Sequence, residues 1–194
     1  MVLTIIILLI AAYILGSIPF GLLIAKLKGI DIRQHGSGNI GATNVYRTLG
    51  PAYGIVVFAL DMLKGTLPVI LASHFTQNYW LIIAAGGAAA VGHMLPIFLK
   101  FKGGKGAATG LGVLLGIAPD IFLLAVILAF LVIYLTKYVS IGSISTAVLV
   151  TTSLYLLNRP LPYTIVAGGI TVLLIIRHIP NIKRLLNGTE NKIR

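Results

Sequence analysis

The chain has 194 residues, 58% of them hydrophobic and 10% charged, and its mean hydropathy is +1.02. Soluble domains are about half apolar and a quarter charged, so this composition excludes a soluble globular protein and predicts one that spans a bilayer. The net charge of +11 is carried by clusters of Lys and Arg beside apolar runs. Such clusters are typical of loops that face anionic lipids or substrates, and we expect no nucleic-acid partner. The chain has no cysteine, which excludes disulfides, cysteine metal sites and thioester intermediates.

Seven apolar segments are candidates for transmembrane helices, which need about 20 residues each. The first, residues 3–25, lacks the basic start of a secretory signal, so we expect it to be retained, with a kink at Pro19. A polar, glycine-rich stretch over residues 26–50 follows. The remaining expected spans are, in chain order, residues 51–73, 79–99, 107–118, 119–138, 141–157 and 162–176.

The fourth of these segments, residues 107–118, is short, and its glycines leave a re-entrant hairpin open as an alternative to a span. The basic residues favour a span, because seven crossings with the N-terminus outside leave only Arg159 on the outer side. The inner side then holds Lys26, Lys28, Arg33, Arg47, Lys100, Lys102, Lys105, Lys137, Arg177, Lys183, Arg184, Lys192 and Arg194. We therefore predict an all-α integral membrane protein with a single domain, residues 1–194. It has seven transmembrane helices, one of them short, with the N-terminus outside and the C-terminus in the cytoplasm.

The first polar stretch carries small hydrogen-bonding side chains separated by glycines, and it ends in an arginine. Its candidate site residues are Ser37, Asn39, Thr43, Asn44 and Arg47. If a helix begins near Ala42, then Thr43, Asn44 and Arg47 lie on one helical face, with the arginine as the charged clamp for an oxyanion. A solvated loop rich in turn residues has the same composition, and the spacing alone does not separate the two.

The second polar stretch, residues 101–109, places Gly103, Gly104, Lys105 and Gly106 directly before the short fourth helix. A glycine-rich turn that leads into a helix can aim free backbone N–H groups and the positive end of the helix dipole at a phosphate. It is not a nucleotide-binding P-loop, because a glycine stands where the magnesium-binding Ser or Thr is required. A flexible basic turn is the simpler alternative.

Further ionisable residues lie at or inside the spans. His178 and Asn181 close the last span three residues apart, and Pro180 is expected to bend the chain between them. Asp61 and Lys64 lie inside the second span, where charge is costly. They form either a neutralising pair that holds helices together or part of a functional site. We expect no metal site and no cofactor.

Five motifs follow one another along almost the whole chain. They are Gly16-Ser-Ile-Pro-Phe20, Ser37-Gly-Asn-x-Gly-x-Thr-Asn-x-x-Arg47, Asp61-x-x-Lys-Gly65, Gly92-His-x-x-Pro-x-Phe-x-x-Phe-Lys-Gly-Gly-Lys-Gly106 and Arg177-His-x-x-Asn181. Together they resemble the bacterial acyl-phosphate:glycerol-3-phosphate acyltransferases. The resemblance implies transfer of a fatty acyl group from acyl phosphate to the sn-1 hydroxyl of glycerol 3-phosphate. The products are lysophosphatidic acid and phosphate, in the committed step of bacterial phospholipid synthesis.

The resemblance also implies how the residues are used. It assigns the first long motif to catalysis and glycerol phosphate, the glycines of the second to acyl phosphate, and functional roles to His178 and Asn181. Because acyl phosphate carries a good leaving group, we expect direct attack by the glycerol hydroxyl without an acyl-enzyme. The catalytic candidates are Ser37, Arg47, Lys105 and His178. Either His178 or the phosphate of glycerol 3-phosphate takes the hydroxyl proton.

The implied setting is the bacterial inner membrane, with the active site at the cytoplasmic face and membrane lipids around the protein. A soluble enzyme that makes acyl phosphate is a candidate partner. The rival class is a transporter for a phosphorylated solute. A transporter predicts paired repeats around a site at the membrane midplane, and no repeat is visible in this sequence.

Overall fold

The computed structural model describes residues 2–193, and within that range it is helical with no strand. Arg194, one of the basic residues expected on the inner side, lies outside the described residues. The helices are α1 (Val2–Ser17), α2 (Phe20–Leu27), α3 (Ala42–Leu49), α4 (Pro51–Phe75), α5 (Tyr79–Met94), α6 (Ala107–Ile117), α7 (Pro119–Thr136), α8 (Val139–Leu156) and α9 (Leu161–Leu186). Two 3-10 turns, η1 (Ile32–Gln34) and η2 (Ile97–Leu99), follow α2 and α5. The predicted all-α class is confirmed.

Within residues 2–193, five helices are long and apolar enough to cross a bilayer: α4, α5 extended by η2, α7, α8 and α9. A sixth candidate consists of α1 and α2, which are broken between Ser17 and Phe20 and bent by 40°. Pro19 stands in this break, where its ring and missing N–H disfavour a continuous helix, as the sequence predicted. Helix α6 has 11 residues, fewer than the about 20 that a span needs. The count of seven spans and the sides of the membrane on which the two termini lie therefore stay predictions.

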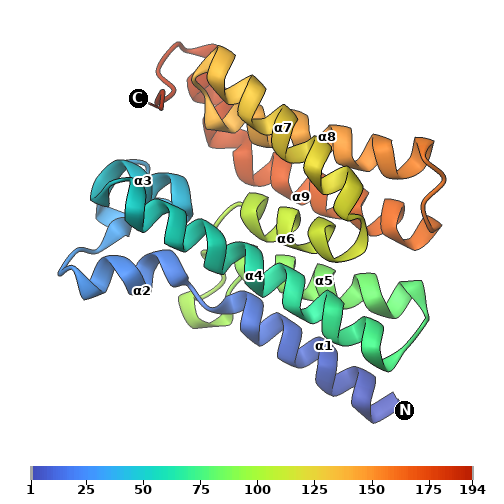
Figure 1. The fold of residues 1–194 in the computed structure, drawn as a ribbon. Helices are drawn as coiled ribbons and strands as arrows, with labels where there is room; N and C mark the ends of the chain where they lie inside the picture. Colours follow the sequence, from blue (N-terminus) through green and yellow to red (C-terminus); the bar gives the residue numbers. More distant parts are fainter. Residues whose placement is uncertain (1, 194) are drawn as a thin grey trace.

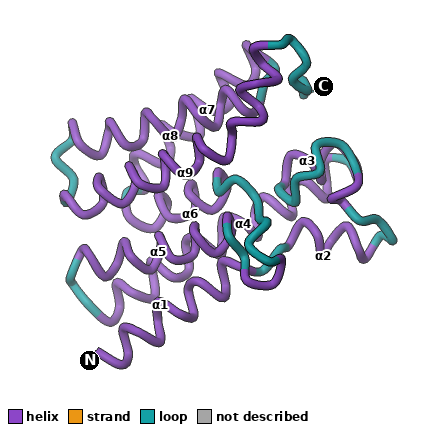
Figure 2. Tube along the Cα trace, turned by 180° about the vertical axis from the view of Figure 1, so that it is seen from behind, coloured by secondary structure: helices purple, strands orange, loops and turns teal. Residues whose placement is uncertain are grey.

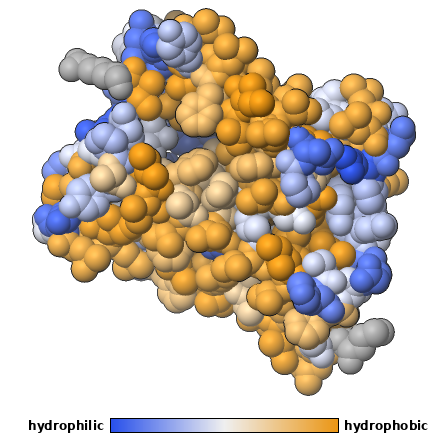
Figure 3. Space-filling model, viewed as in Figure 1, coloured by the Kyte–Doolittle hydropathy of each residue, from blue (hydrophilic) through white to orange (hydrophobic). Residues whose placement is uncertain are grey.

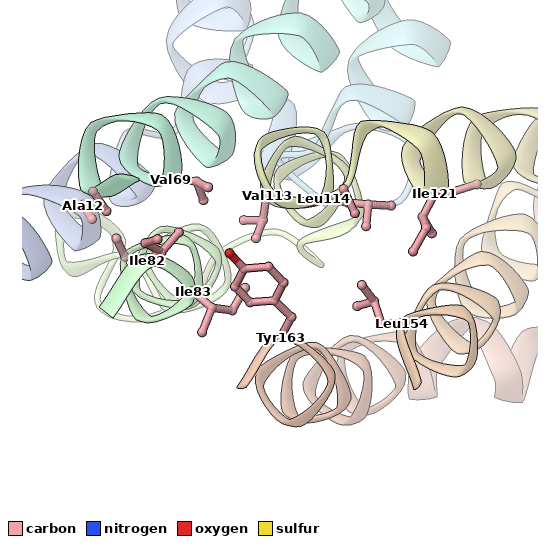
Figure 4. Close-up of a cluster of buried hydrophobic side chains, with 13 residues drawn as sticks. Ala12, Val69, Ile82, Ile83, Val113, Leu114, Ile121, Leu154 and Tyr163 are labelled. Carbon is pink, nitrogen blue, oxygen red and sulfur yellow. The ribbon is translucent and has the colours of Figure 1, made fainter. Parts of the chain in front are cut away.

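The helices form two groups with α6 between them (Figures 1 and 2). Helix α1 packs along α5 and α4 packs on both, whereas α7, α8 and α9 lie side by side on the other side of α6. Every residue of α6 is buried or partly buried. Its Val113 and Leu114 share the main apolar core with Ile83 of α5 and Leu154 of α8 (Figure 4). The short helix is therefore the centre of the fold.

Glycines let α6 lie directly against α4. A Cβ added to Gly112 would come 1.9 Å from the Met62 carbonyl oxygen, and one added to Gly65 would come 2.2 Å from the Thr109 carbonyl oxygen. Both obstacles are backbone atoms, so no larger residue fits, as in the small-residue seams between membrane helices. The hydroxyl of Thr66 donates a hydrogen bond of 2.8 Å to the Gly112 carbonyl across the seam. These contacts fix α6 on α4.

The face of the molecule shown in Figure 3 is apolar over its middle and hydrophilic toward its ends. Large apolar side chains are exposed, among them Leu71 at 50% and Phe130 and Tyr134 at 71% each. In water an apolar surface of this extent would lead to aggregation, whereas in a bilayer lipid covers it. The protein is an integral membrane protein that crosses the bilayer several times.

The last helix extends further than the sequence predicted. We expected the span to end at residue 176 with a bend at Pro180, but α9 continues to Leu186 with Pro180 inside it. Proline removes one backbone hydrogen bond, yet a helix that is packed on its neighbours can continue through that position. His178 and Asn181 therefore lie about one turn apart within α9, and both are buried.

Candidate active site

Three of the motifs, residues 37–47, 92–106 and 177–181, meet at a polar cavity of about 170 Å³. It lies between the loop before α3, the first turn of α6, the C-terminal half of α9 and the tail that follows α9. Figure 3 shows the surface hollowed between α3 and this tail. The predicted site residues that line it are Ser37, Asn39, Thr43, Asn44, Arg47, Lys105, Gly106, His178 and Asn181. Gly103 lines a neighbouring opening, and Gly104 lies behind the wall, against His93.

Two helices, α3 and α6, begin at the cavity wall. Gly106 caps α6 with a φ of +85°, in the left-handed region that favours glycine. The first-turn residues that line the cavity are Ala42 and Thr43 of α3 and Ala107 and Ala108 of α6. The first N–H groups of a helix have no intrahelical acceptor, and the helix dipole adds positive potential there. Two such ends in one cavity favour the binding of an oxyanion.

The loop before α3 is shaped by the side chain of Asn44, which is 2% exposed. Its Nδ2 lies within 2.9 Å of the carbonyl oxygens of His35 and Asn39 and 3.2 Å from that of Ile32. Its Oδ1 accepts a hydrogen bond of 2.9 Å from the backbone N–H of Ser37. The loop therefore uses the hydrogen-bonding capacity of Asn44, whose role in this structure is to position Ser37 and Asn39.

The glycine-rich turn is docked on the end of α5. The N–H of Gly103 donates to the Met94 carbonyl at 3.2 Å, and the N–H of Gly104 donates to the His93 carbonyl at 3.1 Å. Arg177 of α9 holds the other side of the turn, because its Nη2 donates to the Gly103 carbonyl at 2.6 Å. Its Nε donates to the Gly104 carbonyl at 3.2 Å. Contrary to the predicted cradle, the N–H groups of Gly103 and Gly104 are not free, because both donate to carbonyls at the end of α5.

A chain of hydrogen bonds runs from Lys105 to the C-terminal tail. Lys105 Nζ donates to Asn181 Oδ1 at 2.5 Å, and Asn181 Nδ2 donates to Glu190 Oε1 at 2.6 Å. Glu190 is 8% exposed and also accepts from Ser140 Oγ at 3.0 Å and Arg184 Nε at 2.7 Å. Burial favours the neutral acid, but the hydrogen bonds from Asn181, Arg184 and Ser140 outweigh it and lower the pKa of Glu190. The tail therefore carries a carboxylate into the wall of the cavity.

Lys105 is partly buried, and the loss of hydration lowers the pKa of its ammonium group to about 8. The carboxylate of Glu190 opposes this shift. The guanidinium groups of Arg184, Arg47 and Arg177 lower the pKa further. Lys105 is thus a cation at neutral pH that can lose its proton under mildly alkaline conditions.

Arg47 reaches from α3 to the C-terminal tail. Its Nη2 donates to the Asn191 carbonyl at 2.8 Å, while its Nε is buried without a hydrogen-bond partner among the described residues. The tail is tied down in turn by the Ile193 N–H, which donates to the Lys137 carbonyl at 2.8 Å. Burial lowers the pKa of Arg47, but a guanidinium stays charged in proteins. A buried guanidinium N–H that lacks a partner is a donor for an anionic ligand.

His178 is 3% exposed and lines the cavity from α9. Its Nδ1 lies 2.8 Å from the Leu174 carbonyl oxygen. Since a carbonyl can only accept, Nδ1 carries the proton, and Nε2 of the neutral ring is left as an acceptor. Within residues 2–193, no three His, Cys, Asp or Glu side chains gather closely enough to hold a metal ion.

A wider opening of about 560 Å³, which we call the vestibule, adjoins the cavity. It shares Ser37, Asn39, Lys105 and Asn181 with the cavity. The further cations of its lining are Arg33, Lys102, Arg177 and Arg184, and no acidic side chain of the described residues lines it. The vestibule therefore presents a strongly positive surface to a soluble anion.

An apolar groove of about 90 Å³ adjoins the cavity on another side. It lies between α6, α8 and α9 and is lined by residues such as Leu114, Val150 and Leu174. Ala107 and Leu111 belong to both the groove and the cavity. An apolar space and a polar space therefore adjoin at the start of α6, which matches a molecule with an apolar tail and an anionic head.

Comparison with known proteins identifies the family. The model of the family "Glycerol-3-phosphate acyltransferase" matches residues 6–188. The chain belongs to this family. Members from Aquifex aeolicus and Bacillus velezensis are 47% and 49% identical to it, over 95% and 96% of this chain and 97% and 96% of theirs. Two crystal structures of PlsY (YgiH), an integral membrane glycerol 3-phosphate acyltransferase, are similar to this chain. They are its glycerol 3-phosphate form and its lysophosphatidic acid form, and each is 43% identical in sequence to this chain. They cover 98% of this chain and 96% of their own, with TM-scores of 0.95 and 0.93.

Reasoning from the sequence gave no role to three residues of the site in this glycerol-3-phosphate acyltransferase family member, although two of them, His93 and Arg177, stand in its motifs. Arg177 holds the glycine-rich turn, Glu190 lies in the tail, and His93 lines the cavity beneath the turn. Glu190 could have been found, since the chain has 4 acidic residues against 15 basic ones. A carboxylate near three basic motifs needs a partner. The role of Arg177 depends on α9 passing beside the turn, which no local pattern predicts.

Proposed function

We propose that the chain transfers a fatty acyl group from acyl phosphate to the sn-1 hydroxyl of glycerol 3-phosphate, giving lysophosphatidic acid and phosphate. The observation that carries the proposal is one cavity, with two cations and two helix N-termini, between an apolar groove and a cationic vestibule. A lipid donor needs the groove, a soluble phosphate ester needs the vestibule, and their reaction needs a place where both meet. The related PlsY structures in glycerol 3-phosphate and lysophosphatidic acid forms support this acceptor and product.

The acyl phosphate binds with its chain in the groove and its phosphate in the cavity. The phosphate then lies near the first N–H groups of α3 and α6, with Arg47 and Lys105 as charged donors. Reasoning from the sequence assigned Arg47 to glycerol phosphate and the glycines to acyl phosphate. Because Arg47 and Lys105 line the same cavity, we assign both cations to the phosphate that leaves.

Glycerol 3-phosphate enters through the vestibule, whose cations attract its phosphate and raise its local concentration. Lys105 and Asn181 line both spaces, so the acceptor bound there reaches the acyl carbonyl. Ser37 and Asn39 also line both spaces and supply hydrogen bonds that orient the glycerol hydroxyls. Orientation of two bound substrates accounts for a large share of the rate enhancement in such transfers.

The chemical step is a direct attack. The sn-1 oxygen forms a bond to the acyl carbonyl carbon, the bond from that carbon to the phosphate oxygen breaks, and phosphate leaves with the electron pair. Arg47 and Lys105 stabilise the charge on the leaving phosphate. The hydroxyl proton passes to Nε2 of His178, or else to the phosphate of the bound glycerol 3-phosphate.

The setting follows from the same features. The chain works in the bacterial inner membrane with its site at the cytoplasmic face, which the gathering of basic residues around the site supports. Its C-terminus is cytoplasmic and its N-terminus is outside. Acyl phosphate arrives from the soluble enzyme that makes it or from the surrounding lipid, and the step needs no cofactor.

The test is turnover by purified protein in detergent with hexadecanoyl phosphate and glycerol 3-phosphate, followed by mass spectrometry of the products. We expect lysophosphatidic acid and phosphate in equal amounts. His74→Ala changes an exposed histidine away from the cavity and should retain full activity. Turnover with hexadecanoyl-coenzyme A comparable to that with acyl phosphate would contradict the proposal, and so would turnover that does not depend on glycerol 3-phosphate.

A further inference from the structure

Three buried ionisable side chains lie beneath the glycine-rich turn and take no part in the chemical step described above. Asp61 and Lys64 lie on α4 and His93 lies in the last turn of α5, with at most 5% of each residue exposed. Asp61 Oδ1 lies 2.8 Å from Lys64 Nζ and 3.5 Å from His93 Nδ1. Charges buried in a membrane protein are expensive, so a group of this kind needs both mutual pairing and a function that retains it.

The ion pair is anchored independently of the turn. Lys64 Nζ donates to the Ile18 carbonyl at 2.8 Å, at the break between α1 and α2. It also lies 5.5 Å from the centre of the Phe20 ring. Three separate contacts therefore hold Lys64, and through Lys64 they fix the carboxylate of Asp61 on the inner side of α4.

His93 is the surface on which the turn rests. A Cβ added to Gly104 would come 2.1 Å from His93 Nε2, so only glycine allows the backbone of the turn to lie on the imidazole ring. The carbonyl of His93 accepts the N–H of Gly104, so backbone and ring hold the turn together. His93 Nδ1 makes no hydrogen bond with any residue that the structure describes, and the nearest carboxylate is Asp61. The ring thus lies between Asp61 and the turn, and both side chains also contribute to the lining of the cavity.

The glycine-rich turn is held between α9 and α5, and this fixes the position of Lys105, the residue that follows Gly104. Arg177 holds the carbonyls of Gly103 and Gly104 from α9, and His93 supports the turn from α5. Lys105 comes next in the chain and lines the cavity. A displacement of the turn therefore moves Lys105 and the start of α6 together.

We propose that His93, held in place by the Asp61–Lys64 ion pair, is a positioning residue that sets where Lys105 and the N-terminus of α6 lie in the cavity. This inference rests on the proposed function. His93 acts through Lys105 and does not exchange a proton with substrate. Asp61 and Lys64 act on the turn only through His93, because they fix the position of its imidazole ring.

The experiment compares His93→Ala and His93→Gln with the matched control His74→Ala. Each purified protein is first shown to be folded by measuring its thermal unfolding in detergent. In His93→Ala the turn loses its support, and kcat should fall by about 10- to 100-fold, as expected for a displacement of a catalytic group by about 1 Å. In His93→Gln the longer side chain still fills the space, and most of kcat should return. His74→Ala should match the wild type.

The pH profile separates positioning from a merely structural effect. Burial depresses the pKa of Lys105, and the charged groups that face it are Arg47 of α3, Arg177 and Arg184 of α9 and Glu190 of the tail. If His93→Ala lets the turn rise, Lys105 gains water, and the alkaline loss of activity should move to higher pH. A lower amount of folded enzyme alone would lower kcat without moving the profile.

A wild-type enzyme that is inactive with acyl phosphate and glycerol 3-phosphate would refute the proposed function itself. An active wild type with an unchanged kcat and pH profile in His93→Ala would overturn the positioning role alone. If His93→Ala does not fold, Gly104→Ala provides the second measurement, because its methyl group pushes the turn off the same ring. Folded Gly104→Ala should show the same loss and the same upward shift, and a wild-type pH profile in that variant would overturn the proposal.

Discussion

The protonation of Lys105 should limit the enzyme in mildly alkaline solution. The pKa of its ammonium is lowered to about 8, so about nine tenths of the molecules carry the charge at pH 7 and about one tenth at pH 9. The proposed reaction needs the charged form, because Lys105 stabilises the leaving phosphate. We therefore expect kcat/KM to fall about tenfold for each unit above pH 8, relative to its value at pH 7.

Two substitutions assign this fall to Lys105. Lys105→Arg keeps the charge with a group that is not deprotonated in proteins, so the alkaline fall should disappear even though the plateau is lower. Glu190→Gln removes the carboxylate that opposes the lowered pKa, so the fall should begin at lower pH. The assay measures lysophosphatidic acid from pH 6 to 10, with uncatalysed hydrolysis of acyl phosphate subtracted. An alkaline fall near pH 8 that persists in Lys105→Arg would refute this reasoning.

Three further predictions concern the groove, the proton acceptor and the topology. Gly110 lines the groove, and a Cβ there meets nothing within 4 Å, so Gly110→Leu should fold and shift the preference of the enzyme to shorter acyl chains. The control Gly169→Leu, at an equally open position in α9, should leave the chain preference unchanged. Equal chain preference in the two variants would refute the assignment of the groove to the acyl chain. If His178 is the base, His178→Ala should lower kcat by about 10² to 10⁴-fold, and a loss below about tenfold would leave the substrate phosphate as the acceptor. Single cysteines at His74 and Asn187 should react with impermeant reagents from opposite sides of the membrane, and labelling from one side would contradict the orientation.

The fold could be predicted wherever one physical signal dominated. Long apolar runs predict helices because the bilayer demands internal hydrogen bonding, and α4, α7 and α8 begin within two residues of the expected positions. The break at Pro19 followed from the missing N–H. The continuation of α9 through Pro180 could not be predicted, since the contacts on either side of it, made by Arg177 with the glycine-rich turn and by Asn181 with Lys105 and Glu190, join parts of the chain far apart in sequence.

The site was predictable in its residue types and less so in their roles. Glycines before α6 predicted an anion cradle, but Gly103 and Gly104 are glycines because the turn lies against the end of α5. Asn44 lines the cavity as predicted for a substrate-binding residue, but the hydrogen bonds by which it shapes the loop before α3 were not predicted. Roles of this kind depend on which groups are already hydrogen-bonded in the folded chain, and sequence spacing carries no such information.

The central claim is that one cavity holds the reacting phosphate while the groove between α6, α8 and α9 holds the acyl chain. A structure of the protein with a non-hydrolysable acyl phosphonate tests this most directly. We predict the phosphonate near the first turns of α3 and α6, within hydrogen-bond reach of Arg47 and Lys105, with its chain along Leu114 and Val150. A phosphonate bound outside Lys105 in the vestibule, or a chain along another face of the bundle, would contradict the account.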